Sequence, residues 1–120
     1  MDVPDLHRRA VDSFGERVRL IGDDQWHMPT PCSDWDVRDL VHHLTYEAAW
    51  TPAMFAGMTI AEAGDRFEGD LLGHEPQQAW ERVSAPAVAA VNEPGAMQRT
   101  VHLSFGDFSG EFYAGQLFAD

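Results

Sequence analysis

Hydrophobic residues recur at helical spacing in four separate segments of this 120-residue chain. The first segment runs from about Asp5 to Ile21, where Val11, Phe14 and Val18 fall on one helical face. Leu6 extends that face toward the start of the segment. The pattern predicts an amphipathic first helix whose apolar side packs into a core.

The second segment begins after a loop that contains Pro29 and Pro31. Asp36 is expected to cap the helix, and Asp39 three residues later completes a capping box. The helix should weaken near Pro52 and end by residue 57. Its predicted apolar face consists of Val37, Leu40, Val41, Leu44 and Ala48.

The remaining segments complete an all-α pattern. A third helix is expected from Pro76, with a kink at Pro86, and a fourth from the N-cap Ser109. Between them, residues Thr100–Phe105 alternate apolar and polar, which predicts a short strand or a straight crossing loop. Residues 1–120 should therefore form a single four-helix bundle domain with one short extended segment before the last helix.

The fourth helix has no stop signal before the chain ends at Asp120. No glycine, proline or basic last turn follows, and the terminal carboxylates lie at the unfavourable negative end of the helix dipole. We therefore expect a domain truncated at its C-terminus. A second copy would cover the apolar surface so exposed, which makes a homodimer the expected assembly.

The net negative charge of the chain argues against two classes of binding partner, nucleic acids and anionic membranes. The chain carries 20 acidic residues against 8 basic ones, a net charge of −12, and every basic residue is arginine. Such a chain repels phosphate backbones and anionic lipid surfaces, so neither nucleic acid nor a membrane is an expected partner. One cysteine and an N-terminus without an apolar core of signal-peptide length predict a reducing, cytoplasmic location.

Candidate chemistry centres on the second helix. At about 100° per residue, His43 lies on the flank of the apolar face, whereas His42 points toward solvent. Glu47, four residues after His43, is a second metal ligand, a carboxylate that orients the His43 ring, or an ordinary helix pair. His43 itself is either a metal ligand or a hydrogen-bonded bundle histidine.

Other titratable residues carry weaker signals. Asp120 shares a helical face with Tyr113 and Leu117, so it either points inward toward a metal or frays into solvent. Cys32, shortly before the second helix, is a thiol of lowered pKa or a small packed side chain. Three further histidines, His7, His27 and His74, stand in contexts that predict exposure.

Two runs of sequence resemble a known family. The run WHMPTPCSDWDVRDLVHHL, from Trp26 to Leu44, resembles the N-terminal motif of the mycothiol-dependent maleylpyruvate isomerase family in the DinB-like superfamily. The run from Arg99 to Asp120 is similar to that family's passage into its last helix, and single-domain actinobacterial members are the most similar.

The resemblance implies a four-helix bundle that binds one divalent metal ion, zinc or nickel. It assigns His43 as one ligand and Asp120 as another, while the position of a third ligand falls four residues beyond Asp120. In related enzymes the metal activates the thiolate of a small thiol, mycothiol, toward an electrophilic substrate. The expected activity is that of a metal- and mycothiol-dependent isomerase or S-transferase, which the missing ligand would weaken.

A second hypothesis requires no metal. The same helices would serve as a non-catalytic module that binds a small apolar ligand or a protein partner. The two hypotheses differ in metal content, because a folded state that binds a metal ion is stabilised by it.

Overall fold

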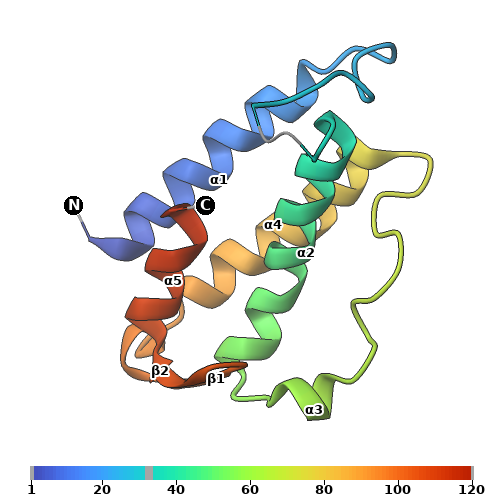
Figure 1. The fold of residues 1–120 in the computed structure, drawn as a ribbon. Helices are drawn as coiled ribbons and strands as arrows, with labels where there is room; N and C mark the ends of the chain where they lie inside the picture. Colours follow the sequence, from blue (N-terminus) through green and yellow to red (C-terminus); the bar gives the residue numbers. More distant parts are fainter. Residues whose placement is uncertain (1, 32–33, 120) are drawn as a thin grey trace.

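The computed structural model of the protein describes residues 2–31 and 34–119. The fold is mostly helical with a small two-stranded sheet (Figure 1). In chain order the elements are α1 (Val3–Arg19), α2 (Val37–Phe55), α3 (Ile60–Ala63), α4 (Pro76–Val91), the 3-10 helix η1 (Ala96–Gln98), β1 (Thr100–Leu103), β2 (Gly106–Ser109) and α5 (Gly110–Ala119).

The four longer helices pack side by side. α2 lies along α4, and α1 contacts both α4 and α5. The connection from α3 to α4 returns along the length of α2, while β1 and β2 close the end of the molecule where α5 begins (Figure 1). No helix among the described residues is both long and apolar enough to cross a lipid bilayer.

The core consists of two clusters. One lies near the sheet and contains Phe55, Val91, Val101 and Ala114, of which Val101 and Ala114 are fully buried. The other joins α1, α2 and α4 through a second set of buried side chains, Val18, Val41, Leu72, Ala79, Trp80 and Ala87. These clusters fix the relative positions of the helices that carry the candidate site.

The predicted helix signals at α2 and α5 are confirmed. The Asp36 carboxylate accepts the N–H of Asp39 at 2.8 Å, and the Asp39 carboxylate accepts the N–H of Asp36 at 3.1 Å. This reciprocal pair satisfies two backbone donors that the first turn of a helix leaves free. At α5, the Ser109 hydroxyl accepts the N–H of Phe112 at 3.1 Å.

The extended segment is one half of a hairpin. Thr100–Leu103 pairs antiparallel with Gly106–Ser109, and Val101 stands opposite Phe108. The alternation at Thr100–Phe105 marked β1 alone, because the second strand contains two polar residues and a glycine and shows no comparable alternation. The Nδ1 atom of His102 contacts the Asp107 carboxylate across the pair at 2.8 Å.

Two predictions of exposure are wrong. His7 is buried, with 4% of its surface exposed, whereas Leu6 is 38% exposed. The apolar stripe of α1 thus runs through position 7 and not position 6. His42, predicted to be solvated, is partly buried beneath the α3–α4 connection, which no local pattern in α2 could reveal.

Candidate metal site

His43 and Glu47 meet on the surface of α2. The Nε2 atom of His43 lies 3.1 Å from a carboxylate oxygen of Glu47, one helical turn further along. Residues four apart on a helix lie above one another, so the backbone itself sets this approach. The His43 side chain is 36% exposed and that of Glu47 21% exposed, which leaves both groups accessible to a ligand.

Trp35 also contacts the His43 ring. The ring centroids lie 4.9 Å apart with an interplanar angle of 42°. Trp35 stands just before the capping box of α2, so the same local structure that starts the helix also places this indole. The His43 imidazole thus contacts both an aromatic ring and a carboxylate.

An open groove begins at Glu47 and runs between α2, α5 and the hairpin. Its volume is about 460 Å³. The lining is largely aromatic and aliphatic and includes Tyr46, Trp50, Met54, Leu103, Phe105, Tyr113 and Leu117. Gln116 adds an amide on the α5 side, so a ligand in this groove would meet apolar walls with a few polar groups.

Tyr113 stays protonated at the wall of this groove. Burial, helped by the nearby negative charge of Glu47, raises the pKa of its hydroxyl to about 12 despite the lowering effect of a hydrogen bond with Thr51. Thr51 in turn donates to the Glu47 carbonyl at 2.9 Å. Among the described residues that line the groove, Glu47 is the one with a charged side chain.

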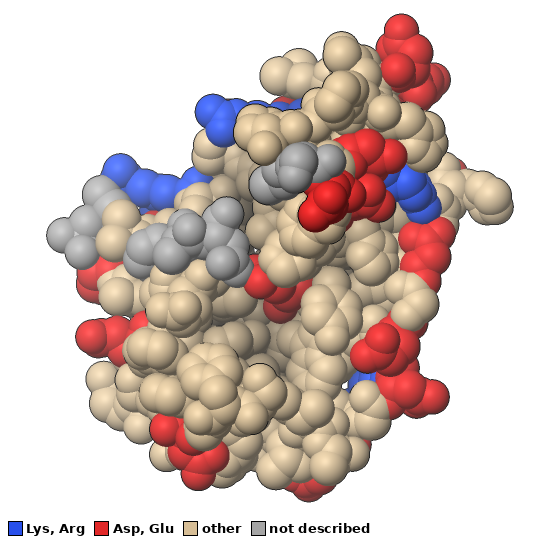
Figure 2. Space-filling view, in the orientation of Figure 1, with Lys and Arg blue, Asp and Glu red and all other residues tan. Residues whose placement is uncertain are grey.

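A second hollow, of about 480 Å³, has His43 itself in its wall, together with Asp34, Asp39 and His42. Acidic side chains are spread over the face shown in Figure 2, with few basic ones between them. Within the part of the chain that the structure describes, no group of three or more histidine, cysteine or acidic side chains is placed to hold a metal ion. Asp120 and Cys32, two of the predicted candidates, fall outside the described residues.

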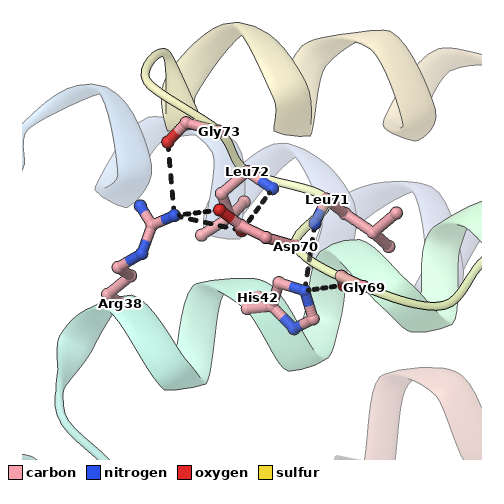
Figure 3. A network of polar contacts seen from close by, with 7 residues as sticks. All are labelled: Arg38, His42, Gly69, Asp70, Leu71, Leu72 and Gly73. Carbon is pink, nitrogen blue, oxygen red and sulfur yellow. Dashed lines mark hydrogen bonds and ion pairs between the residues drawn. The ribbon is translucent and has the colours of Figure 1, made fainter.

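His42 belongs to a structural network and not to the groove (Figure 3). Its Nε2 atom lies 3.1 Å from the Gly69 carbonyl oxygen and 3.2 Å from the Leu71 nitrogen. One ring nitrogen either donates or accepts, so the tautomer of His42 decides which of the two contacts is a hydrogen bond. Either bond fastens the α3–α4 connection to α2.

Arg38 strengthens the same attachment one turn earlier on α2. Its guanidinium donates to both oxygens of Asp70, at 2.9 and 3.0 Å, and to the Gly73 carbonyl at 3.2 Å (Figure 3). Partial desolvation alone would raise the pKa of the Asp70 carboxyl, but the Leu72 N–H and the charge of Arg38 outweigh it and lower that pKa. The ion pair between Arg38 and Asp70 thus holds the α3–α4 connection against α2.

His7, like His42, is a titratable side chain whose burial the sequence interpretation missed. Its Nδ1 atom is buried and has no hydrogen-bond partner, and burial lowers the pKa of the ring. The signal was present in the sequence, since His7, Val11, Phe14 and Val18 follow the 4, 3, 4 spacing of one helical face. For a histidine within an apolar stripe, its position on the helix is therefore a better guide to burial than the polarity of its side chain.

Comparison with known proteins agrees with the resemblance seen in the two sequence runs. A family model described as mycothiol maleylpyruvate isomerase N-terminal domain matches residues 7–111. Two uncharacterized proteins of Mycobacterium tuberculosis, from strains CDC 1551 / Oshkosh and ATCC 25618 / H37Rv, are each 31% identical over 115 residues, which is 96% of this chain and 59% of theirs.

The chain thus spans about three fifths of the length of these relatives. No solved structure shows a significant match. The family match covers most of α1, all of α2, α3, α4 and the hairpin, and the start of α5, and it includes both His43 and Glu47. This chain belongs to the mycothiol maleylpyruvate isomerase N-terminal domain family.

Proposed function

We propose that this chain is a DinB-like four-helix bundle domain that binds one divalent metal ion and supports thiol-dependent isomerase or transferase chemistry. α1, α2, α4 and α5 supply the four helices, with the hairpin leading into the last of them. The observation that carries the proposal is the contact between His43 and Glu47 beside an open groove, within a domain of this family.

The chemistry of the donors fits a zinc or nickel ion, which imidazole nitrogens and carboxylate oxygens bind at about 2.0–2.2 Å. A carboxylate oxygen of Glu47 lies 3.1 Å from the Nε2 atom of His43, the distance expected of a carboxylate that orients the ring of a metal-binding histidine. We assign His43 as a ligand, Asp120 as a second ligand, and Glu47 as this orienting carboxylate.

A bound divalent ion supplies a Lewis acid that holds a thiol as its thiolate, the nucleophilic form. The chain's own residues then have separate tasks. Trp35 and Glu47 keep the His43 ring in one orientation, and the groove receives the carbon skeleton of the thiol and of an electrophilic substrate. Mycothiol is the thiol that the family description names, and it is the thiol we propose.

Metal titration tests these roles residue by residue. We expect His43→Ala to abolish zinc or nickel binding measured by calorimetry, while the far-ultraviolet circular dichroism of the protein stays unchanged. His74→Ala removes another exposed histidine and serves as the matched control. Equal affinity in the wild type and in His43→Ala would contradict the assignment.

Glu47→Gln separates a ligand from an orienting group. The amide keeps the size of the side chain but loses its charge, and removal of a group that orients a metal-bound histidine weakens metal affinity by about 10–100-fold. Complete loss of binding would instead make Glu47 a direct ligand. If neither the wild type nor any variant binds metal, the second hypothesis stands, a non-catalytic module for a small apolar ligand or a protein partner.

A further inference from the structure

The groove between α2, α5 and the hairpin carries charge of one sign. Its described lining includes the Glu47 carboxylate and neither arginine nor histidine, and the chain contains no lysine. Residues 1, 32, 33 and 120, which lie outside the described part of the chain, have no basic side chain either. An anionic ligand in this groove would therefore meet no side-chain cation among the residues that the structure describes.

The basic side chains of the neighbouring elements are held by other partners. Just before β1, the Arg99 guanidinium donates to the Glu93 carboxylate at 2.8 Å. Within the hairpin, the Nδ1 atom of His102 lies 2.8 Å from the Asp107 carboxylate. On α2, Arg38 is paired with the α3–α4 connection. A ligand that needed one of these groups would first have to break its existing contact.

An anion is disfavoured in the groove for two reasons. The negative charge of Glu47, which also acts on the Tyr113 hydroxyl, repels a second carboxylate. A ligand carboxylate would also leave water for walls that are mostly apolar, which costs free energy when no partner replaces the water. Maleylpyruvate, which the family description names, carries two carboxylates, so both costs apply to it twice.

The walls instead suit a neutral ligand with a flat apolar body. The Trp50 ring lies 4.8 Å from the ring of Phe67 and 6.2 Å from that of Tyr46, measured between centroids, so this wall is a packed group of aromatic rings. Phe105, in the turn of the hairpin, adds a ring to the lining with 67% of its surface exposed. An apolar ligand would remove this surface from water, which is favourable.

The groove also has the room and a neutral polar group for such a molecule. In another protein, an engineered cavity of about 150 Å³ binds benzene, so about 460 Å³ holds an aromatic ring together with several further groups. Gln116, exposed on α5, presents an amide that donates to a carbonyl oxygen. This side chain can orient a neutral carbonyl compound without placing a charge in the groove.

We propose that the electrophile received by this groove is a neutral molecule with an aromatic ring and a carbonyl group, and not a dicarboxylate such as maleylpyruvate. The proposal rests on the proposed function for the chemistry that follows binding. The choice between neutral and anionic ligands is made before any bond forms, so binding alone reveals it.

A matched pair of ligands tests this choice. N-phenylsuccinimide is neutral, and N-phenylsuccinamic acid, its ring-opened hydrolysis product, is an anion at about pH 7.5. Neither has the reactive double bond with which a maleimide would modify Cys32. We use the full chain treated with a chelator, so that no metal ion attracts the anion. In titrations followed by nuclear magnetic resonance, we expect the imide to bind at least about 10-fold more tightly.

Two exposed positions show whether this binding occurs in the groove. Phe105→Ser removes an exposed ring from the lining and should weaken binding of the imide. Leu20→Ser is the matched control, because Leu20 is 81% exposed and lies outside the groove lining. Absence of saturable imide binding by the wild type, or equal binding in Phe105→Ser, would overturn the proposal.

An added positive charge should reduce the preference. Gln116→Arg places a guanidinium at an exposed position of the wall, so it should lower the preference for the imide by about 2–5-fold, the effect of one ion pair open to solvent. Gln78→Arg adds the same charge at an exposed position of α4 outside the lining and should leave the preference unchanged. Equal or tighter binding of the anion by the wild type would refute the inference, as would an unchanged preference in Gln116→Arg.

Failure of this inference is distinguishable from failure of the proposed function. The preference for the imide should be the same in chelator-treated wild type and in His43→Ala. A chain that binds no metal ion but prefers the imide would contradict the proposed metal function alone. A chain that binds one metal ion, yet shows equal affinity for imide and anion after chelation, would contradict this inference alone.

Discussion

The start of α5 packs so closely against η1 and Phe55 that one methyl group added at Gly110 should destabilise the protein. Gly110 is buried, and its N–H donates to the Arg99 carbonyl at 2.8 Å. A Cβ atom at this position would lie 2.1 Å from the Ala96 carbonyl oxygen and 2.8 Å from a ring carbon of Phe55. Both distances are far below van der Waals contact, and the nearer atom belongs to the backbone, which cannot rotate away.

The magnitude follows from this geometry. Overfilling a packed core costs about 1–3 kcal/mol, and a clash with backbone places Gly110→Ala near the upper end, at about 3 kcal/mol. Gly115 offers the matched control on the same helix, since nothing lies within 4 Å of a Cβ added there. Alanine is a better helix former than glycine by about 1 kcal/mol, so Gly115→Ala should stabilise the protein by about that amount.

Urea denaturation followed by circular dichroism measures both effects. With an m value of about 1.5 kcal/mol/M, Gly110→Ala should lower the midpoint by about 2 M and Gly115→Ala should raise it by about 0.7 M. Gly110→Ala should also weaken ligand binding in the groove, because α5 carries Tyr113 and Gln116 into its wall. If Gly110→Ala were as stable as the wild type, the close contact of α5 with η1 would be refuted.

Two further predictions follow from individual side chains. Burial lowers the pKa of His7 below its usual 6.5, so the unfolded chain takes up a proton on this residue at a higher pH than the folded protein does. The free energy of unfolding should therefore decrease as the pH falls from 7 to 5. This decrease should be smaller in His7→Leu. A pH dependence equal to that of the wild type in His7→Leu, measured by urea denaturation, would contradict this. Arg38→Gln should lower the free energy of unfolding by at most about 1 kcal/mol, because the ion pair with Asp70 is partly exposed. It should nevertheless raise the rate of amide hydrogen exchange in residues 69–73. Arg82→Gln, on the exposed surface of α4, is the control and should leave that rate unchanged.

Local patterns predicted those parts of the fold whose causes are local. The capping box at Asp36 and Asp39, the N-cap at Ser109 and the approach of Glu47 to His43 all depend on residues three or four apart. The position of His7 on the apolar face of α1 was also sufficient to predict its burial. The prediction that His7 is exposed was wrong because it relied on the polarity of histidine and not on this position.

Contacts between distant segments were out of reach of the same reasoning. His42 is partly buried because Gly69 and Leu71, 27 and 29 residues away, fold back over α2. The second strand of the hairpin is specified by its pairing with β1 and not by alternation of its own. A cavity of about 190 Å³ that includes His7 in its wall is lined by side chains of α1, α2, α4 and α5, so no single segment encodes it.

The most direct test of the central claim is the metal content of the purified chain, measured by elemental analysis beside His43→Ala and His74→Ala. We predict about one zinc or nickel ion per chain in the wild type and in His74→Ala, and none in His43→Ala. Absence of metal from the wild type after exposure to both ions, or equal content in His43→Ala, would contradict a metal site built on His43.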